Sequence, residues 1–302
     1  MTGTPPLSSS VAAVRRSLMR ELRGAGTENC AGEADSILIR LLDCTRAALL
    51  GRPERILTDA QIFSAGEAVR RRVNGEPLQY VLGETYFYGR PFETKKGVLI
   101  PRPETELLVE LALEFLPSSA PPVFLDWGTG SGCIAITLLL ERPLTTAVMA
   151  EKNPLSLQQA WKNAARHGVL GRAFLWHSQT PEDIFAAPVV PAAGRSPLPD
   201  LVVSNPPYIP TGDIPNLMRE VRDHEPRMAL DGGEDGMDFY RLLFRYAPLW
   251  LKPGGHLLLE IGDAAQAEKM RATTPPALKL VKEVRDYAGI PRCMAWEKRG
   301  SM

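Results

Sequence analysis

The chain has 302 residues, of which 44% are hydrophobic and 23% charged, and its 35 basic residues balance its 35 acidic ones. This length predicts roughly two domains, and the apolar fraction is enough to bury a core, which excludes a disordered chain or a small disulfide scaffold. A formal net charge of zero gives no electrostatic reason to expect binding to nucleic-acid phosphates.

The spacing of the cysteines and the pattern of apolar residues exclude further classes of protein. The cysteines stand far apart, with no CxxC pair, so neither a disulfide framework nor a metal site is expected. The first ten residues lack the layout of a signal peptide, and no apolar run approaches the roughly 20 residues that span a bilayer. We therefore expect a cytoplasmic protein that has no membrane association and works as a monomer.

Residues 1–80 are predicted to form a helical domain. Apolar side chains recur at helical spacing over 11–22 and 37–49, and both runs stop at a glycine. Thr58 and Gln61 stand in capping-box positions at the start of a third helix.

Residues 81–103 are predicted to link this domain to the next. Aromatic and turn residues between Tyr86 and Phe92 alternate about a Gly-Arg-Pro turn, which predicts a β-hairpin. Beyond it, helices and strands alternate over residues 104–302, which predicts an α/β domain with a Rossmann-like, doubly wound parallel sheet. The Pro-rich segment 186–199 is expected to be a surface loop. Strands are expected at 123–126, 146–150, 201–204 and 256–261, helices at 104–116, 132–141, 154–168 and 237–249, and a closing antiparallel pair at 279–286 and 292–297.

The sequence DWGTGSG at residues 126–132 lies where the first expected strand passes into a helix. Its alternating glycines allow a ligand to lie against the backbone. The spacing is GxGxG after an acid, unlike the GxGxxG of dinucleotide sites, and suits a cationic or hydroxyl-bearing ligand better than a phosphate. Glu151, about 20 residues later, has the position of an acid that accepts hydrogen bonds from ribose hydroxyls. Together these features indicate S-adenosylmethionine, with a tight turn and a helix-capping acid as the alternative.

Asn205-Pro206-Pro207-Tyr208 follows a short apolar strand, at the sheet edge where doubly wound folds keep their ligands. The prolines present their carbonyls rigidly, so the Asn205 side chain and the Pro206 carbonyl could accept the two N–H groups of a planar amide. Tyr208 offers an aromatic face to the substrate or to the sulfonium. Two acceptors would make a weakly nucleophilic nitrogen attack without a general base. An ordinary strand-ending turn is the alternative.

At this point the chain resembles the HemK/PrmC family, whose members are protein-(glutamine-N5) methyltransferases acting on the Gly-Gly-Gln loop of class 1 peptide chain release factors. The segments that carry the resemblance are GEPLQYVLG (75–83), FYG (87–89), VLIPRPETELLVE (98–110), DWGTGSGCIAI (126–136), VVSNPPYIP (202–210), EPRMALDGGEDGMDFYR (225–241) and LKPGGHLLLEIG (251–262).

The resemblance implies a class I methyltransferase fold, S-adenosylmethionine as cofactor and docking of the release factor by the N-terminal helices. It implies a cofactor site made of Gly128, Thr129, Gly130, Ser131, Gly132, Glu151, Thr180 and Asn205, and a catalytic and substrate site made of Asn205, Pro206, Pro207 and Tyr208.

The sequence departs from the family pattern at two places. Glu151 stands where the family usually has Asp, and Ser178-Gln179-Thr180 replaces the usual stretch before the adenine contact, so that Gln179 and Thr180 are both candidates for that contact.

Three functions remain open. The first is methylation of a release-factor glutamine. The second is an amino-methyltransferase acting through the same NPPY chemistry on nucleic acid, or on a ribosomal-protein glutamine. The third is a scaffold that binds S-adenosylmethionine without catalysis. The zero net charge argues against a nucleic-acid substrate, and the intact NPPY sequence argues against a scaffold without catalytic activity.

Overall fold

A computed structural model describes residues 9–116, 121–187 and 198–300, and the chain divides into two compact units. The first unit combines residues 1–84 with residues 218–224, and the second combines residues 85–217 with residues 225–302. The expected domain boundaries at residues 80 and 103 do not predict that residues 218–224 belong to the first unit. An ion pair between Arg72 and Glu220, with N and O 3.0 Å apart, joins residues 218–224 to the N-terminal helices. No local sequence pattern predicts this contact.

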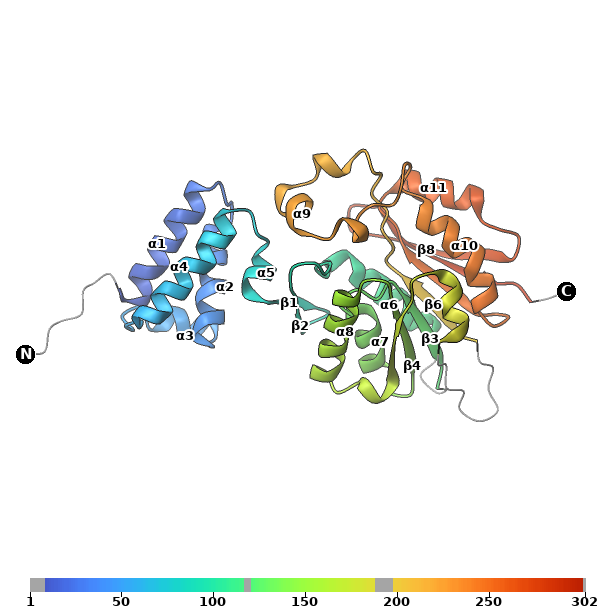
Figure 1. The fold of residues 1–302 in the computed structure, drawn as a ribbon, viewed down its shortest axis with the longest axis horizontal. Helices are drawn as coiled ribbons and strands as arrows, with labels where there is room; N and C mark the ends of the chain where they lie inside the picture. Colours follow the sequence, from blue (N-terminus) through green and yellow to red (C-terminus); the bar gives the residue numbers. More distant parts are fainter. Residues whose placement is uncertain (1–8, 117–120, 188–197, 301–302) are drawn as a thin grey trace, which may run out of the picture. The chain divides into compact units, whose positions relative to one another are not determined.

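The first unit is a bundle of helices around one apolar core (Figure 1). Each long helix buries a stripe of side chains, such as Val14, Leu18 and Leu22 on the first. The capping box is confirmed, because Thr58 and Gln61 each accept a hydrogen bond from the other's backbone N–H. Its helices are α1 (Val11–Gly24), α2 (Cys30–Leu42), α3 (Arg46–Gly51), α4 (Asp59–Val73), α5 (Leu78–Leu82) and α9 (Arg219–His224).

The second predicted helical run is two helices. α2 ends at Asp43, which adopts a left-handed conformation with φ of 45°. Thr45 then starts α3 by accepting a hydrogen bond from the backbone N–H of Ala48. The apolar spacing runs on across this break, so periodicity alone does not reveal it.

A two-stranded hairpin, β1 (Glu84–Phe87) and β2 (Arg90–Glu93), confirms the predicted one. The turn itself is shifted. Tyr88 and Gly89 occupy it with φ of 50° and 69°, the paired positive values that suit a two-residue hairpin, and Pro91 lies inside β2. The Tyr88 backbone N–H donates to Glu106, 2.7 Å away, which stabilises a conformation that tyrosine rarely adopts.

The second unit is built on a seven-stranded sheet of order β5-β4-β3-β6-β7-β9-β8. Its strands are parallel except for β9, which runs antiparallel to both neighbours. The closing antiparallel pair is thus confirmed. The strands are β3 (Val123–Trp127), β4 (Thr146–Glu151), β5 (Ala173–His177), β6 (Leu201–Ser204), β7 (His256–Glu260), β8 (Leu278–Arg285) and β9 (Pro291–Lys298).

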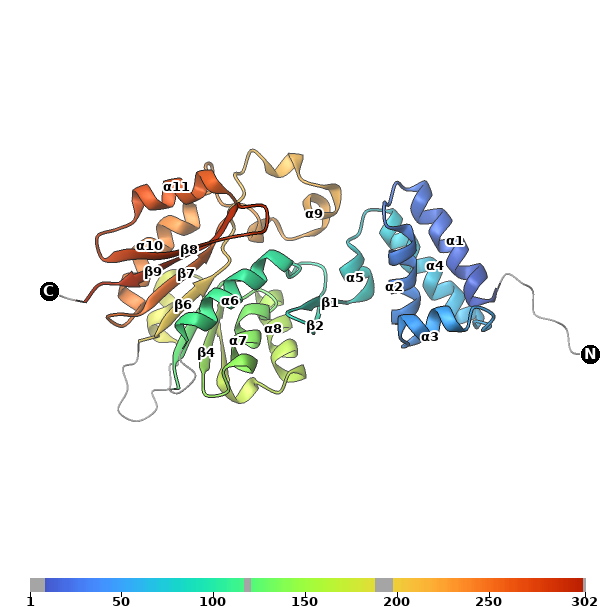
Figure 2. The ribbon, with the colours of Figure 1, turned by 180° about the vertical axis from the view of Figure 1, so that it is seen from behind.

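Helices cover both faces of this sheet (Figures 1 and 2). α6 (Glu106–Phe115), α7 (Cys133–Glu141) and α8 (Pro154–Arg166) share one core with the sheet, and α10 (Asp238–Trp250) and α11 (Ala264–Thr273) share the other. The doubly wound α/β prediction is therefore confirmed. The sequence pattern does not predict α11, because its apolar residues form no stripe at helical spacing.

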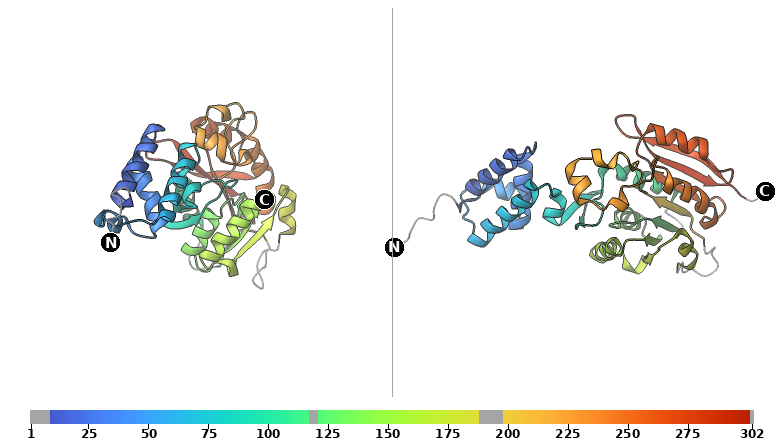
Figure 3. Two further views of the ribbon diagram at one scale, coloured as in Figure 1. Left: turned by 60° about the vertical axis from the view of Figure 1, so that its left-hand side comes forward. Right: turned by 45° about the horizontal axis from the view of Figure 1, so that its top comes forward.

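The chain order creates one switch point in the sheet. From β3 the chain adds β4 and β5 on one side and then crosses to β6 on the other side of β3. The carboxyl ends of β3 and β6 therefore border the crevice in which open α/β sheets bind ligands; Figure 3 shows the sheet from two further directions. No helix in the described ranges is long and apolar enough to cross a membrane. The core of the Pro-rich segment, residues 188–197, lies outside those ranges.

Candidate active site

The glycine loop joins β3 to α7 at the switch point. Gly128, Gly130 and Gly132 have positive φ values of 76°, 58° and 83°, a conformation that favours glycine. A Cβ atom on Gly128 would meet nothing within 4 Å, and one on Gly130 only the Gly128 carbonyl oxygen at 4.0 Å. These two glycines thus border open space on which a ligand can lie.

Gly132 has a different role from the other two glycines. A Cβ atom there would lie 2.8 Å from Ile136 Cδ1 and 2.9 Å from Met149 Cε. Because side chains of the core occupy that side, Gly132 allows α7 to pack closely on the sheet and does not face the open side of the loop.

The loop has few N–H groups left for a phosphate. The backbone N–H groups of Gly128 and Thr129 both donate to the Ala150 carbonyl, at 2.9 and 3.0 Å, and that of Gly132 donates to Thr129, at 2.8 Å. The Gly130 N–H donates to Glu151 Oε2, 2.9 Å away. A phosphate site needs such groups unpaired, so this loop suits a ligand without phosphate.

Glu151 at the end of β4 accepts hydrogen bonds both from the glycine loop and from the turn that follows β4. Besides the bond from Gly130, its Oε1 accepts the Asn153 backbone N–H at 2.8 Å. Burial raises the pKa of Glu151, and these backbone donors oppose the shift. A carboxylate has about four acceptor positions, so acceptor capacity remains on Glu151 for a hydroxyl donor of a ligand.

The buried side chains of the loop serve its own stability. Thr129 donates its hydroxyl to Asp126 Oδ2, 2.6 Å away, and Ser131 accepts the Asn163 side chain through its carbonyl, at 2.9 Å. Asp126 is completely buried, and burial raises its pKa to about 7. Its Oδ1 has no hydrogen-bond partner in the described part of the chain. Asp126 therefore lies beneath the loop and not on its open side.

The two candidates for the adenine contact follow β5, next to Glu151. The Ser178 N–H donates to the Glu151 carbonyl at 3.0 Å, which fixes this segment beside β4. The backbone N–H groups of Gln179 and Thr180 both donate to Asp183, and both residues are exposed. An adenine contact by either one stays a prediction.

The Asn205–Tyr208 segment leaves β6 directly beside the glycine loop. Asp126 and Val203 are partners in the β3–β6 ladder, and the Ser204 hydroxyl donates to the Trp127 carbonyl, 2.6 Å away. The structure thus brings the predicted cofactor and substrate loops to one edge of the sheet.

Contacts from later in the chain hold Tyr208 from both sides. Gln266 on α11 donates its side-chain amide to the Tyr208 carbonyl at 2.6 Å and accepts the Gly262 N–H at 2.9 Å. A Cβ atom on Gly262 would lie 2.9 Å from the Tyr208 ring, and one on Gly232 would lie 2.8 Å from Tyr208 Cα. One on Gly236 would lie 2.5 Å from the Tyr208 carbonyl oxygen.

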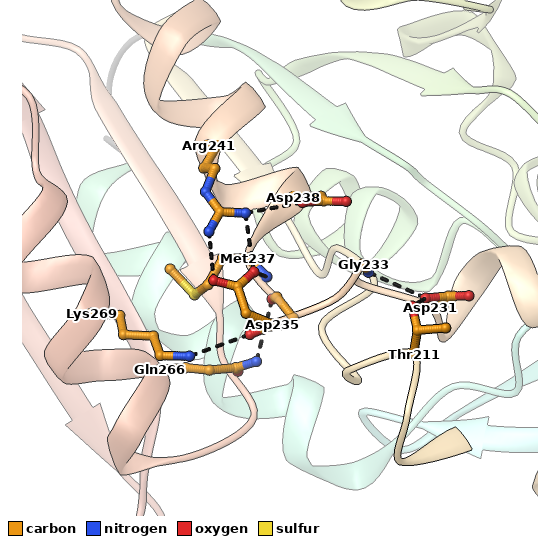
Figure 4. Close-up of polar contacts among 10 residues, drawn as sticks. Thr211, Asp231, Gly233, Asp235, Met237, Asp238, Arg241, Gln266 and Lys269 are labelled. Atoms are coloured by element: carbon orange, nitrogen blue, oxygen red, sulfur yellow. Dashed lines mark hydrogen bonds and ion pairs between the residues drawn. The ribbon is translucent and has the colours of Figure 1, made fainter. Parts of the chain in front are cut away.

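The glycine segment 231–236 is itself tied down (Figure 4). Asp231 accepts the Thr211 hydroxyl at 2.5 Å, and Asp235 forms an ion pair with Arg241. The Gly232 N–H donates to the Ile209 carbonyl at 2.8 Å. These residues are absent from the predicted site. The glycines of DGGEDG were the available signal, because such a run marks a close backbone approach.

Two of the resembling segments meet through one ion pair. Arg102, in the PRPETE segment, pairs with Glu225 of the EPRMAL segment at 2.5 Å. The same carboxylate accepts the Ile100 N–H at 3.3 Å. Glu225 is almost completely buried, so this pair fixes the entry to α6 against the segment that follows the substrate loop.

The geometry fits S-adenosylmethionine. Its ribose hydroxyls can donate to the free acceptor positions of Glu151, and its methionine part can lie over the open backbone of Gly128 and Gly130. The small number of unpaired N–H groups on the described loop agrees with a cofactor that carries no phosphate. This arrangement needs no histidine base; the exposed His177 donates from Nε2 to the Lys152 carbonyl oxygen, 3.0 Å away.

The fold and the two adjoining loops define a class I methyltransferase that depends on S-adenosylmethionine. Family models agree, since the chain matches "PrmC N-terminal domain" over residues 13–83 and "Methyltransferase small domain" over residues 104–223. A protein of Bradyrhizobium diazoefficiens named release factor glutamine methyltransferase is 37% identical over 298 residues, 97% of each chain. One of the same name from Geobacter sulfurreducens is 42% identical over 243 residues, 80% of each chain. The chain therefore belongs to the release factor glutamine methyltransferase family.

Among solved structures, the catalytic domain of hMettl16 in complex with a MAT2A 3′UTR hairpin superposes with a TM-score of 0.51 at 13% identity, covering 80% of this chain and 84% of that one. This likeness supports the methyltransferase fold and says nothing about substrate.

Proposed function

We propose that this enzyme transfers a methyl group from S-adenosylmethionine to the side-chain amide nitrogen, N5, of the glutamine in the Gly-Gly-Gln motif of a class 1 peptide chain release factor. The observation that carries the proposal is the placement of the Asn205–Tyr208 segment beside the glycine loop, at the carboxyl ends of the paired strands β6 and β3. The family names of relatives that match nearly the whole chain support the choice of substrate.

The chemistry requires activation of a poor nucleophile, since the amide lone pair is delocalised into the carbonyl. Asn205 Oδ1 and the Pro206 carbonyl receive no hydrogen bond from any described residue, so each can accept one N–H of the substrate amide. This arrangement raises electron density on nitrogen and aims its lone pair at the methyl group. When bound, S-adenosylmethionine supplies that methyl group on a positively charged sulfur.

Tyr208 acts by shape and not as a base. Burial raises its pKa to about 12, so its hydroxyl keeps its proton at neutral pH. Its ring can pack on the planar substrate amide or face the sulfonium. The proton that the nitrogen loses after alkylation therefore passes to solvent and not to this side chain.

The test is a methylation assay with labelled cofactor on the full-length protein. A release factor should become labelled, and the same factor with its Gly-Gly-Gln glutamine replaced by Ala should not. DNA, RNA and ribosomal proteins are assayed in parallel. Label on nucleic acid or on a ribosomal protein but not on the release factor would contradict the proposal.

We further propose that the helical domain, residues 1–80, docks the release factor in the cytoplasm, and that the enzyme acts as a monomer without binding nucleic acid. Phe63 on α4 is 75% exposed, and aromatic side chains are enriched at protein–protein interfaces. Replacement of Phe63 by Ser should raise KM for the release factor, while the control Leu144→Ser, a side chain 54% exposed in the second unit, should not. Equal KM values in both variants would contradict docking through this surface, and light scattering measures the oligomeric state.

A further inference from the structure

The proposed mechanism depends on which way the Asn205 side chain is turned. An amide has an acceptor end and a donor end of nearly the same shape. Only the orientation that places Oδ1 toward the substrate can accept its N–H group. The reverse orientation would place two donors against each other and lose the activation.

The donor end of Asn205 is held by Thr105. Asn205 Nδ2 donates to Thr105 Oγ1, with the two atoms 3.0 Å apart. Thr105 ends the short 3₁₀ helix at Pro103–Thr105, immediately before α6, and only 2% of its surface is exposed. A buried hydroxyl that accepts from Asn205 has its own proton left to donate.

Glu260, the last residue of β7, lies beside Asn205, because Ser204 and Leu259, the residues directly before them, are partners in the parallel β6–β7 ladder. Only 2% of its surface is exposed. Hydrogen bonds from Thr105 and Asn205 to this carboxyl group lower its pKa, against the larger effect of burial, which raises it to about 7. An acceptor at this place repels Oδ1 and attracts Nδ2. Its Oε2 has no hydrogen-bond partner within the described ranges, so the carboxyl group can accept a further hydrogen bond.

We propose that Thr105 and Glu260 are positioning residues that hold the Asn205 amide with its oxygen toward the substrate. This inference rests on the proposed function. It also explains what the PRPETE segment contributes to the site. Its Arg102 fixes the start of α6 through Glu225, and its threonine sets the orientation of the asparagine 100 residues later.

The decisive variants remove and restore the hydroxyl group. Thr105→Val keeps the shape of the side chain but cannot accept from Asn205, so kcat should fall about 10- to 100-fold, the cost of losing one buried hydrogen bond and its geometry. The affinity for S-adenosylmethionine and the KM for the release factor should stay unchanged. Thr105→Ser should restore most of kcat.

The matched control is Thr137→Val. Thr137 on α7 is also completely buried, and its Oγ1 has no hydrogen-bond partner among the described residues. Its loss should leave kcat unchanged. Glu260→Gln, which can both donate and accept, should lower kcat by a smaller factor, because it tolerates either orientation of Asn205.

A second readout does not depend on activity. The side-chain NH₂ resonance of Asn205, identified by its absence in Asn205→Ala, should shift and exchange faster with solvent in Thr105→Val than in the wild type, and Thr105→Ser should restore it. Failure of the proposed function would show as a wild-type enzyme that leaves the release factor unlabelled. This inference is overturned if Thr105→Val keeps both wild-type kcat and the wild-type resonance, or if it weakens cofactor binding as much as kcat.

Discussion

The glycine loop and the Asn205–Tyr208 segment adjoin at one sheet edge, yet they are held in different ways. The glycine loop is fixed by its own neighbours: Ala150 and Glu151 on the adjacent strand receive three of its N–H groups. The Asn205–Tyr208 segment is fixed by groups far away in the chain, among them Thr105 and Gln266. The cofactor site is therefore a local structure, whereas the substrate site exists only in the complete second unit.

Loss of the Asn205 amide should impair catalysis at the substrate site without affecting the cofactor site, and it should have the largest effect of the substitutions considered. In Asn205→Ala, kcat should fall about 10²- to 10³-fold, as for removal of one preorganised polar contact to the reacting group. Calorimetry should show unchanged affinity for S-adenosylmethionine. If affinity and kcat fall together, Asn205 serves the cofactor or the fold and the two sites are not separable.

The pH dependence of stability should report on both regions, because the buried Asp126 lies beneath the glycine loop and the buried Glu260 lies beside Asn205. The pKa of Asp126 and that of Glu260 are raised to about 7 in the folded chain. Between roughly pH 4 and 7 the folded state then binds more protons than the unfolded state, so stability falls as pH rises and levels off above about pH 7.

Each of these carboxyl groups should cost the folded state on the order of 3–4 kcal/mol above that window. Urea unfolding followed by tryptophan fluorescence measures the second unit, because it contains all 5 tryptophans. Asp126→Asn and Glu260→Gln should each flatten the curve. Slopes equal to the wild type in both variants would show that the two groups are already ionised when buried.

Two substitutions within the glycine loop should separate its packing from its binding role. Gly132→Ala meets Ile136 and Met149 and should lower the free energy of unfolding by about 2–3 kcal/mol. Gly128→Ala faces open space, so it should lower stability by only about 1 kcal/mol but weaken cofactor binding more. Equal losses of stability would contradict this division of roles.

The substitution with the smallest expected effect tests whether the close packing of Gly232 against Tyr208 positions the substrate loop. Gly232→Ala places a Cβ atom against the Tyr208 backbone, so the loop must shift and kcat should fall about tenfold with unchanged cofactor affinity. Gly212→Ala, a glycine in the same region with nothing within 4 Å of the new atom, is the control. A Gly232→Ala enzyme as active as the control would mean that the loop position is not critical.

Local signals gave the correct elements in many places and failed where a contact was distant. The Thr58–Gln61 capping box and the strand before Asn205 could be predicted, because they depend on residues close in sequence. The expected hairpin turn lies one residue too late, because Tyr88 takes a positive φ and its backbone N–H donates to Glu106, a residue distant in the sequence. α11 has no apolar stripe, and its buried Gln266 becomes meaningful only when Tyr208 lies against it.

The amino-acid sequence by itself determined the α/β class, the glycine loop, the acid at its second strand and the NPPY motif, because each is a short pattern whose chemistry is local. Only the tertiary structure decided that Gly132 packs while Gly128 and Gly130 border open space, that residues 218–224 belong with the N-terminal helices, and that Thr105 and Glu260 adjoin Asn205. The physical reason is that a hydrogen bond or a steric contact depends on distance in space, and the fold brings together residues such as Tyr208 and Gln266, 58 positions apart, and Thr105 and Asn205, 100 positions apart.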